Sequence, residues 1–276
     1  MNRRNKWLTI VLFIALVVIA SAGGFAAFYF WVGTPKVGII ELEGDIYASA
    51  AGRLSQQLWY AEHERSIQAV VLRIDSPGGG VAATEDIYGN VLRLAKKKPV
   101  VVAVDEVAAS GGYFAALGAN YIFAKPTSML GNIGVIIGLP EEELPSESEA
   151  STGPYKTQGA SREGYIRKLE VVKEGFVQAV MFQRGQRLKA DREELSKGEL
   201  YLGIEALHLG LVDEIGTAND AIEKAARMAR LVRYQVVDVL QELAAKERER
   251  YRSITSDLSL PSVSKVTWPR YYYLVR

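Results

Sequence analysis

The stretch PVVVAVDEVAASGGYFAALGA, residues 99–119, decides the fold of this chain. Its first half is a nearly continuous apolar run, which is typical of a strand that helices cover on both faces of a parallel sheet. A corner of small residues follows, with one hydroxyl, Ser110, in front of two glycines. We therefore predict a buried strand that runs into a helix beginning at or near Ser110. A structural corner needs only a glycine, so the hydroxyl indicates a function.

Strand-like and helix-like segments alternate before this corner. Residues 36–44, KVGIIELEG, and residues 67–75, IQAVVLRID, have the pattern of strands, and residues 53–66 between them that of a helix. The run PGGG at residues 77–80 opens a second helix, whose apolar residues recur at helical spacing. This alternation predicts a layered α/β domain.

The same alternation continues after the corner. We expect short strands at residues 121–124 and 133–138, then a helix, a short strand and a helix over residues 203–229. Between them, a long helix from Ser161 carries an apolar stripe that we assign to the core: Leu169, Val172, Phe176 and Val180. The domain then covers residues 37–232, and a C-terminal strand, charged helix and aromatic tail occupy residues 233–276.

Composition excludes several classes of function. The chain has 276 residues, 49% of them hydrophobic, which suits one large domain with appendages. Its net charge of +1 gives no attraction to nucleic acid, and we expect no nucleic-acid partner. There is no cysteine and there are only two histidines, which argues against thiol chemistry and against a metal site. We expect neither a metal nor a cofactor.

The N-terminus predicts a membrane helix over residues 7–31. No charged residue lies between Trp7 and Pro35, and the stretch exceeds the roughly 20 apolar residues that a bilayer core requires. Three basic residues precede it and only Lys36 follows closely, so residues 1–6 are expected in the cytoplasm and the domain outside the cell membrane. A cleaved signal peptide is the alternative, because residues 20–24, ASAGG, are small.

A serine hydroxyl is a weak nucleophile until a neighbouring base takes its proton. The two histidines are poorly placed for a Ser-His-Asp triad, which leaves lysine, and a lysine that acts as a base must be neutral at working pH. Such a lysine should lie among uncharged residues. Lys156, in STGPYKTQGAS, meets this condition, and Lys125 in a short turn is a second candidate.

Acyl transfer also needs backbone donors for the oxyanion. The glycines of DSPGGG, residues 75–80, follow a strand and open a helix, so their amides can point into the space beside the strand ends. A phosphate-binding loop is the rival interpretation of this run. The Lys-Ser/Thr pair that completes a phosphate loop is missing, because VAATED follows instead.

Five segments in order resemble the signal peptide peptidase A family, the single-domain type of serine protease family S49. They are IDSPGGGV, AASGGYFAALGANYIFA, GNIGV, PYKTQGASRE and GLVDEIGTANDAI. The resemblance implies a fold similar to the Clp protease and crotonase group. It also implies that Ser110 is the nucleophile and Lys156 the general base, with the amides of Gly79 and Gly111 as the oxyanion hole.

One position departs from the pattern of this family. The chain has GNIGV where the family usually has GSIGV, with a serine that orients the lysine; Asn132 takes that place and its side-chain oxygen can accept a lysine proton. The resemblance further implies a homo-oligomeric ring or dome and peptide substrates, namely the signal-peptide remnants left in the bilayer after secretion.

Three rival functions stay open at this point. A protease of the stomatin-partner type would cut a specific membrane protein, but usually carries further membrane helices. A crotonase-like acyl-CoA enzyme would use paired amides but has no need of Ser110 and Lys156. A non-catalytic scaffold could keep the fold, and the asparagine at position 132 favours it slightly.

Overall fold

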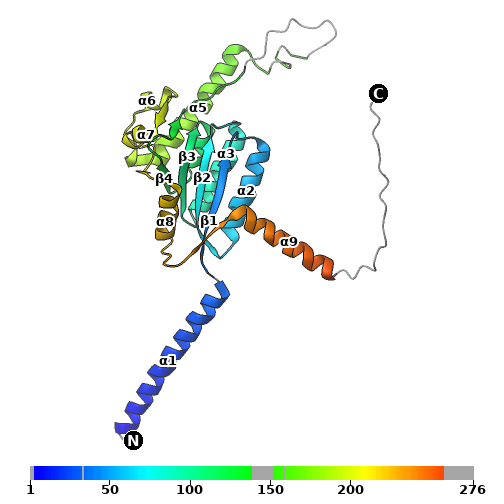
Figure 1. Cartoon of the computed structure of the whole chain (residues 1–276). Helices are drawn as coiled ribbons and strands as arrows, with labels where there is room; N and C mark the ends of the chain where they lie inside the picture. The colour runs from blue at the N-terminus through cyan, green and yellow to red at the C-terminus, as the bar shows by residue number, and fades with distance from the viewer. Residues whose placement is uncertain (1–2, 33, 139–151, 154, 158, 258–276) are drawn as a thin grey trace, which may run out of the picture.

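A computed structural model describes residues 3–32, 34–138, 152–153, 155–157 and 159–257 of the chain. A central sheet carries helices on both faces, and three helices extend from this body: α1 at the N-terminus, α5 beside the sheet and α9 near the C-terminus (Figure 1). The predicted α/β alternation is confirmed.

The strands are short at the sheet edges and long at its centre. They are β1 (Lys36–Glu43), β2 (Ile67–Ser76), β3 (Val100–Ala109), β4 (Tyr121–Ala124), β5 (Met129–Gly131), β6 (Leu200–Leu202), β7 (Glu214–Ile215) and β8 (Gln235–Asp238). The helices are α1 (Arg3–Val32), α2 (Ala48–His63), α3 (Val81–Ala95), α4 (Gly111–Ala116), α5 (Arg162–Arg184), the 3-10 turn η1 (Gly185–Arg187), α6 (Arg192–Ser196), α7 (Gly203–Leu209), α8 (Ala218–Met228) and α9 (Val239–Asp257).

The sheet is parallel except at one edge. Its order is β6-β5-β3-β2-β1-β8, and β6 runs antiparallel to β5. Strand β3 pairs with β2 on one side, while its other side pairs first with β4 at residues 101–104 and then with β5 at residues 107–109. The sheet therefore splits beside the C-terminal end of β3, and such a switch point is where α/β sheets bind ligands.

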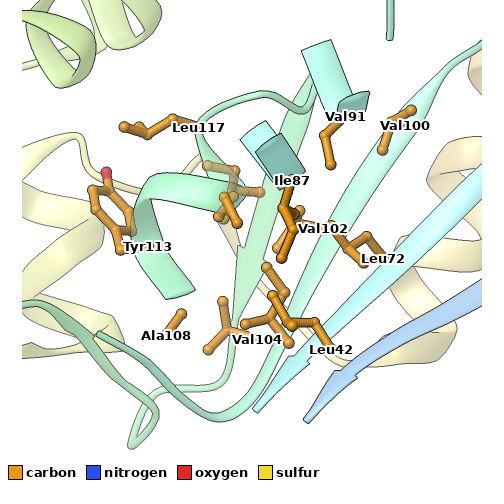
Figure 2. Close-up of a cluster of buried hydrophobic side chains, with 14 of the residues drawn as sticks. Leu42, Leu72, Ile87, Val91, Val100, Val102, Val104, Ala108, Tyr113 and Leu117 are labelled. Atoms are coloured by element: carbon orange, nitrogen blue, oxygen red, sulfur yellow. The ribbon is translucent and has the colours of Figure 1, made fainter. Parts of the chain in front are cut away.

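Alternate residues of the central strands enter two different cores. Val70, Leu72 and Ile74 pack under α2, α3 and α4, whereas Ala69 and Val71 pack under α8. Figure 2 shows the first core, where strand residues meet α3 residues and the aromatic ring of α4. Burial on both faces is the reason that these strands read as continuous apolar runs.

Several predicted boundaries were wrong. Residues 133–138 do not form a strand: β5 ends at Gly131, Asn132 turns the chain with φ of 51°, and Ile136 is 97% exposed. The second side of β3 is already paired with β4 and β5, so this apolar run cannot pair with the central strand. Helix α2 begins at Ala48 rather than at residue 53. On α5, Phe176 and Val180 are buried in the core as predicted, whereas Leu169 and Val172 are only half-buried, and Val172 lines a cavity.

The segment after residue 232 contributes to the sheet. Strand β8 pairs in parallel with β1, and Lys36 of β1 forms an ion pair with Glu242 of α9 at 2.8 Å. The predicted charged helix is present as α9. The aromatic tail lies outside the described residues.

The N-terminal stretch forms the single helix α1. Within the part of the chain that the structure describes, no helix combines the length and the apolar character needed to cross a bilayer. The membrane span expected over residues 7–31 therefore stays a prediction from the sequence.

A buried ion pair connects α5 to the segment before β7. Arg184 is 3% exposed, and its guanidinium donates to both carboxylate oxygens of Asp213, at 2.8 and 3.0 Å, and to the Gly210 carbonyl at 2.7 Å. The same carboxylate accepts the Ile122 amide of β4 at 2.8 Å. Arg187 reaches Asp213 from the surface, at 2.9 Å.

Replacing Arg184 should therefore destabilise the fold strongly. Arg184→Leu leaves the Asp213 carboxylate buried without its main partner, and we expect the free energy of unfolding to fall by about 3–5 kcal/mol. Arg187→Leu removes an exposed partner of the same carboxylate and should cost less than about 1 kcal/mol. Urea unfolding followed by circular dichroism measures both, and equal losses would contradict this assignment.

Candidate active site

Ser110 lies at the sharp corner between β3 and α4. Its φ of 47° and ψ of −118° are values that a residue with a side chain rarely adopts, at a cost of about 1–3 kcal/mol. Two hydrogen bonds hold the corner: the Ser110 amide donates to the Gly131 carbonyl of β5, and the Phe114 amide donates to the Ser110 carbonyl, both at 2.9 Å. A strained strand-to-helix turn of this kind projects a serine hydroxyl out of the backbone.

The glycine loop after β2 lies against this corner. A Cβ added to Gly79 would lie 2.3 Å from the Ile46 carbonyl oxygen, and one added to Gly78 would lie 2.7 Å from the Gly111 nitrogen. Ser76, fully buried, ties the base of the loop: its hydroxyl donates to the Gly44 carbonyl at 2.6 Å and accepts the Gly78 amide at 3.2 Å. Glycine is required here because another backbone occupies the place of a side chain.

The two amides assigned to the oxyanion hole lie in the same place. A Cβ on Gly111 would be 3.3 Å from the Gly79 nitrogen, and both residues line one cavity together with Ser110. Among the described residues, no hydrogen bond occupies the amide of Gly79 or of Gly111. Two unoccupied donors beside a serine hydroxyl are the arrangement that stabilises an oxyanion.

The cavity in front of Ser110 has a volume of about 290 Å³. Its walls are mainly apolar and come from α3, α4, α5 and the segment after Asn132. Phe114 of α4 is part of this wall, and its ring packs against Phe176, which also lines the cavity, and against Tyr88, with centroids 4.9 and 4.8 Å away. This cavity can take one large side chain of a peptide.

The structure does not bring Lys156 to Ser110. Lys156 is exposed in a turn, where its amide donates to the Gly153 carbonyl at 3.2 Å, and no hydrogen bond or ion pair between described residues joins the two side chains. The neighbouring Tyr155 lines a groove that shares Val171 and Val172 with the cavity. The turn thus borders this second groove, and the pairing of Ser110 with Lys156 stays a prediction.

The other two predicted residues have clear positions. Lys125 forms an ion pair with Asp105 at 3.4 Å and does not line the cavity, so it is a poor candidate for a neutral base. Asn132 is exposed and uses its side-chain amide to donate to the Gly198 carbonyl at 2.8 Å. No described contact connects Asn132 to Lys156, so its orienting role also stays a prediction.

Three supporting features were not predicted from the sequence. Thr84 and Glu85, on α3, line the cavity beside Ser110. Tyr113, three residues after Ser110, is fully buried and donates to the Leu211 carbonyl at 2.8 Å, and this burial raises the pKa of its phenol. The sequence signal that could have identified Thr84 and Glu85 is their position just after the glycine run.

Comparison with known proteins identifies the family. The family model described as peptidase family S49 matches residues 93–143 and 148–232, which include Ser110 and Lys156. A putative protease of Synechocystis, slr0021, is 32% identical over 213 residues, which cover 71% of this chain and 75% of that protein. The chain belongs to peptidase family S49.

Other members and structures extend this finding. Protease 4 of Haemophilus influenzae is 32% identical over 212 residues, or 69% of this chain, and the chain spans only 33% of the length of that relative. The fold is similar to that of 1510-N, a membrane-bound stomatin-specific protease, with a TM-score of 0.51, 18% identity, and coverage of 70% of this chain and 86% of that one. A likeness at this identity concerns the fold alone.

The backbone strain at Ser110 predicts that two substitutions at this position differ in their free energy of unfolding. Ser110→Gly relieves the backbone strain, whereas Ser110→Ala removes the hydroxyl and keeps the strain, so the glycine variant should be more stable by about 1 kcal/mol. Urea unfolding of both variants of the full chain measures the difference. An alanine variant at least as stable as the glycine variant would show that the corner is unstrained.

Proposed function

We propose that the chain is a membrane-anchored serine endopeptidase with a Ser-Lys dyad. The observation that carries this proposal is Ser110 at a strained corner, beside the unoccupied amides of Gly79 and Gly111, in front of an apolar cavity. Membership of peptidase family S49 supports the same reaction class.

The proposed cycle is acyl transfer through a serine ester. Neutral Lys156 takes the proton of the Ser110 hydroxyl as its oxygen attacks the peptide carbonyl, and the two amides stabilise the resulting oxyanion. The C–N bond then breaks, and Lys156 returns the proton to the leaving amine. A water attacks the ester in the same manner and releases the acyl product and free Ser110.

This cycle requires Lys156 and Ser110 to be within hydrogen-bond distance during turnover. Hydrogen bonds between catalytic groups often form fully only when substrate is bound. The turn that carries Lys156 borders a groove lined by Tyr155, and this groove shares Val171 and Val172 with the walls of the cavity, which supports such an approach. Asn132 is proposed to orient the amine.

The substrates are proposed to be apolar peptides, in particular signal-peptide remnants in the bilayer. The apolar wall formed by Phe114, Phe176 and Val135 supports this preference. Helix α1 is proposed to anchor the domain on the outer side of the cell membrane. Its support is the uncharged sequence between Trp7 and Pro35 and the exposed apolar side chains from Val11 to Ile19.

A homo-oligomeric ring or dome completes the proposal. Exposed apolar side chains on α5, Met181 and Phe182, support the existence of a surface that a neighbouring copy covers. The resemblance to the signal peptide peptidase A family motivates the ring arrangement, with the sites on the inner face.

The dyad predicts a pH profile with a defined direction. A lysine ordinarily carries a proton at neutral pH, and only the neutral amine can accept the serine proton, so kcat/KM should rise with pH and reach a plateau on the alkaline side. Hydrolysis of a fluorogenic apolar peptide by the full chain in detergent tests this. Ser110→Ala and Lys156→Ala should each lower kcat by at least about a thousandfold.

Lys125→Ala is the matched control, because it removes a lysine that is ion-paired outside the cavity. Its pH profile should be that of the unmodified chain. Retained activity in Lys156→Ala, or a profile that falls with rising pH, would show that another group is the base. An inactive unmodified chain would favour the scaffold interpretation.

A further inference from the structure

The first turns of α3 give one side of the cavity a polar character. Thr84 and Glu85 are consecutive residues there, whereas Phe114, Phe176 and Val172 form the apolar side. Glu85 is the one charged residue among the described residues that line the cavity, and it is exposed. No ion pair or hydrogen bond to another described residue engages its carboxylate.

The hydroxyl of Thr84 adds a second, independent observation. Thr84 is only 4% exposed, and its hydroxyl oxygen is the one buried side-chain polar atom without a hydrogen-bond partner in the described part of the chain. A buried hydroxyl without a partner costs about 1–3 kcal/mol and requires an explanation. The oxygen already faces the site, because a Cβ added to Gly111 would lie 2.5 Å from it and both residues line the cavity.

We propose that the cavity selects a long basic side chain, lysine or arginine, of an otherwise apolar peptide. The aliphatic stem lies against Phe114 and Phe176, and the cationic head reaches the Glu85 carboxylate and the Thr84 hydroxyl oxygen, both of which can accept hydrogen bonds. Lysine and arginine commonly bury the stem and leave the charge at a polar edge. This inference rests on the proposed peptidase function and names the substrate class of the same site.

A matched pair of substrates isolates the charge. Two fluorogenic peptides differ only at the residue that supplies the scissile carbonyl, which is lysine in one and norleucine in the other; norleucine has the same stem without the ammonium group. We expect the full chain to have a higher kcat/KM for the lysine peptide. Glu85→Gln should lower the lysine-to-norleucine ratio of kcat/KM by about fivefold, and Thr84→Val by about twofold.

Asp86→Asn is the matched control. It removes one negative charge from the next residue of the same helix, which is exposed and does not line the cavity, so the ratio should not change. Added salt should lower the ratio of the unmodified chain, because the Glu85 contact lies at the solvent edge.

The outcomes separate this inference from the function on which it rests. Hydrolysis of both peptides with a ratio that Glu85→Gln does not change would overturn the basic subsite alone, and the cavity would then bind purely apolar side chains. An equal fall in the ratio for Glu85→Gln and Asp86→Asn would also overturn it, because the effect would then come from the overall negative charge of the helix and not from a contact with Glu85. Hydrolysis of neither peptide would overturn the peptidase function and this inference together.

Discussion

The structure depends on the close approach of two backbones, the glycine loop after β2 and the corner after β3. An added Cβ on Gly78 would lie 2.7 Å from the Gly111 nitrogen, and one on Gly79 would lie 2.3 Å from the Ile46 carbonyl oxygen. No side chain fits between these segments, so two amides and one hydroxyl share a single cavity. The Ser110 hydroxyl lies beside these two amides only because the loop after β2 contains these glycines.

The surrounding layers maintain this approach. The Tyr113 hydroxyl, just after the corner, donates a hydrogen bond to the Leu211 carbonyl in the segment before β7. The carboxylate of Asp213 joins that segment to β4 and α5. The hydroxyl of Ser76 connects the glycine loop to the end of β1 through hydrogen bonds to Gly78 and Gly44. Strain at one residue persists because buried contacts from several elements hold the corner together.

The central strands and helices were predicted correctly, because the sequence signals that specify them are local. Strands β2 and β3 are buried on both faces, so their apolar runs are unambiguous, and the helix after each run begins within two residues of its glycines. The strand predicted over residues 133–138 is absent for a non-local reason: β4 and β5 already pair with the second side of β3, and the sequence alone does not show which strand edges are taken. Thr84 and Glu85 were missed because their place beside Ser110 results from the packing of α3 on α4. The family resemblance supplied the roles of Lys156 and Asn132, and those roles depend on a contact that the described residues do not make.

The central claim is that Ser110 is an activated nucleophile, and covalent labelling tests it most directly. The full chain in detergent is treated with a fluorophosphonate probe, and the modified residue is located by mass spectrometry of its peptides. The account predicts one adduct, on the Ser110 oxygen, and a much slower reaction in Lys156→Ala. No adduct under conditions that label a known serine peptidase, or an adduct on another serine, would contradict it.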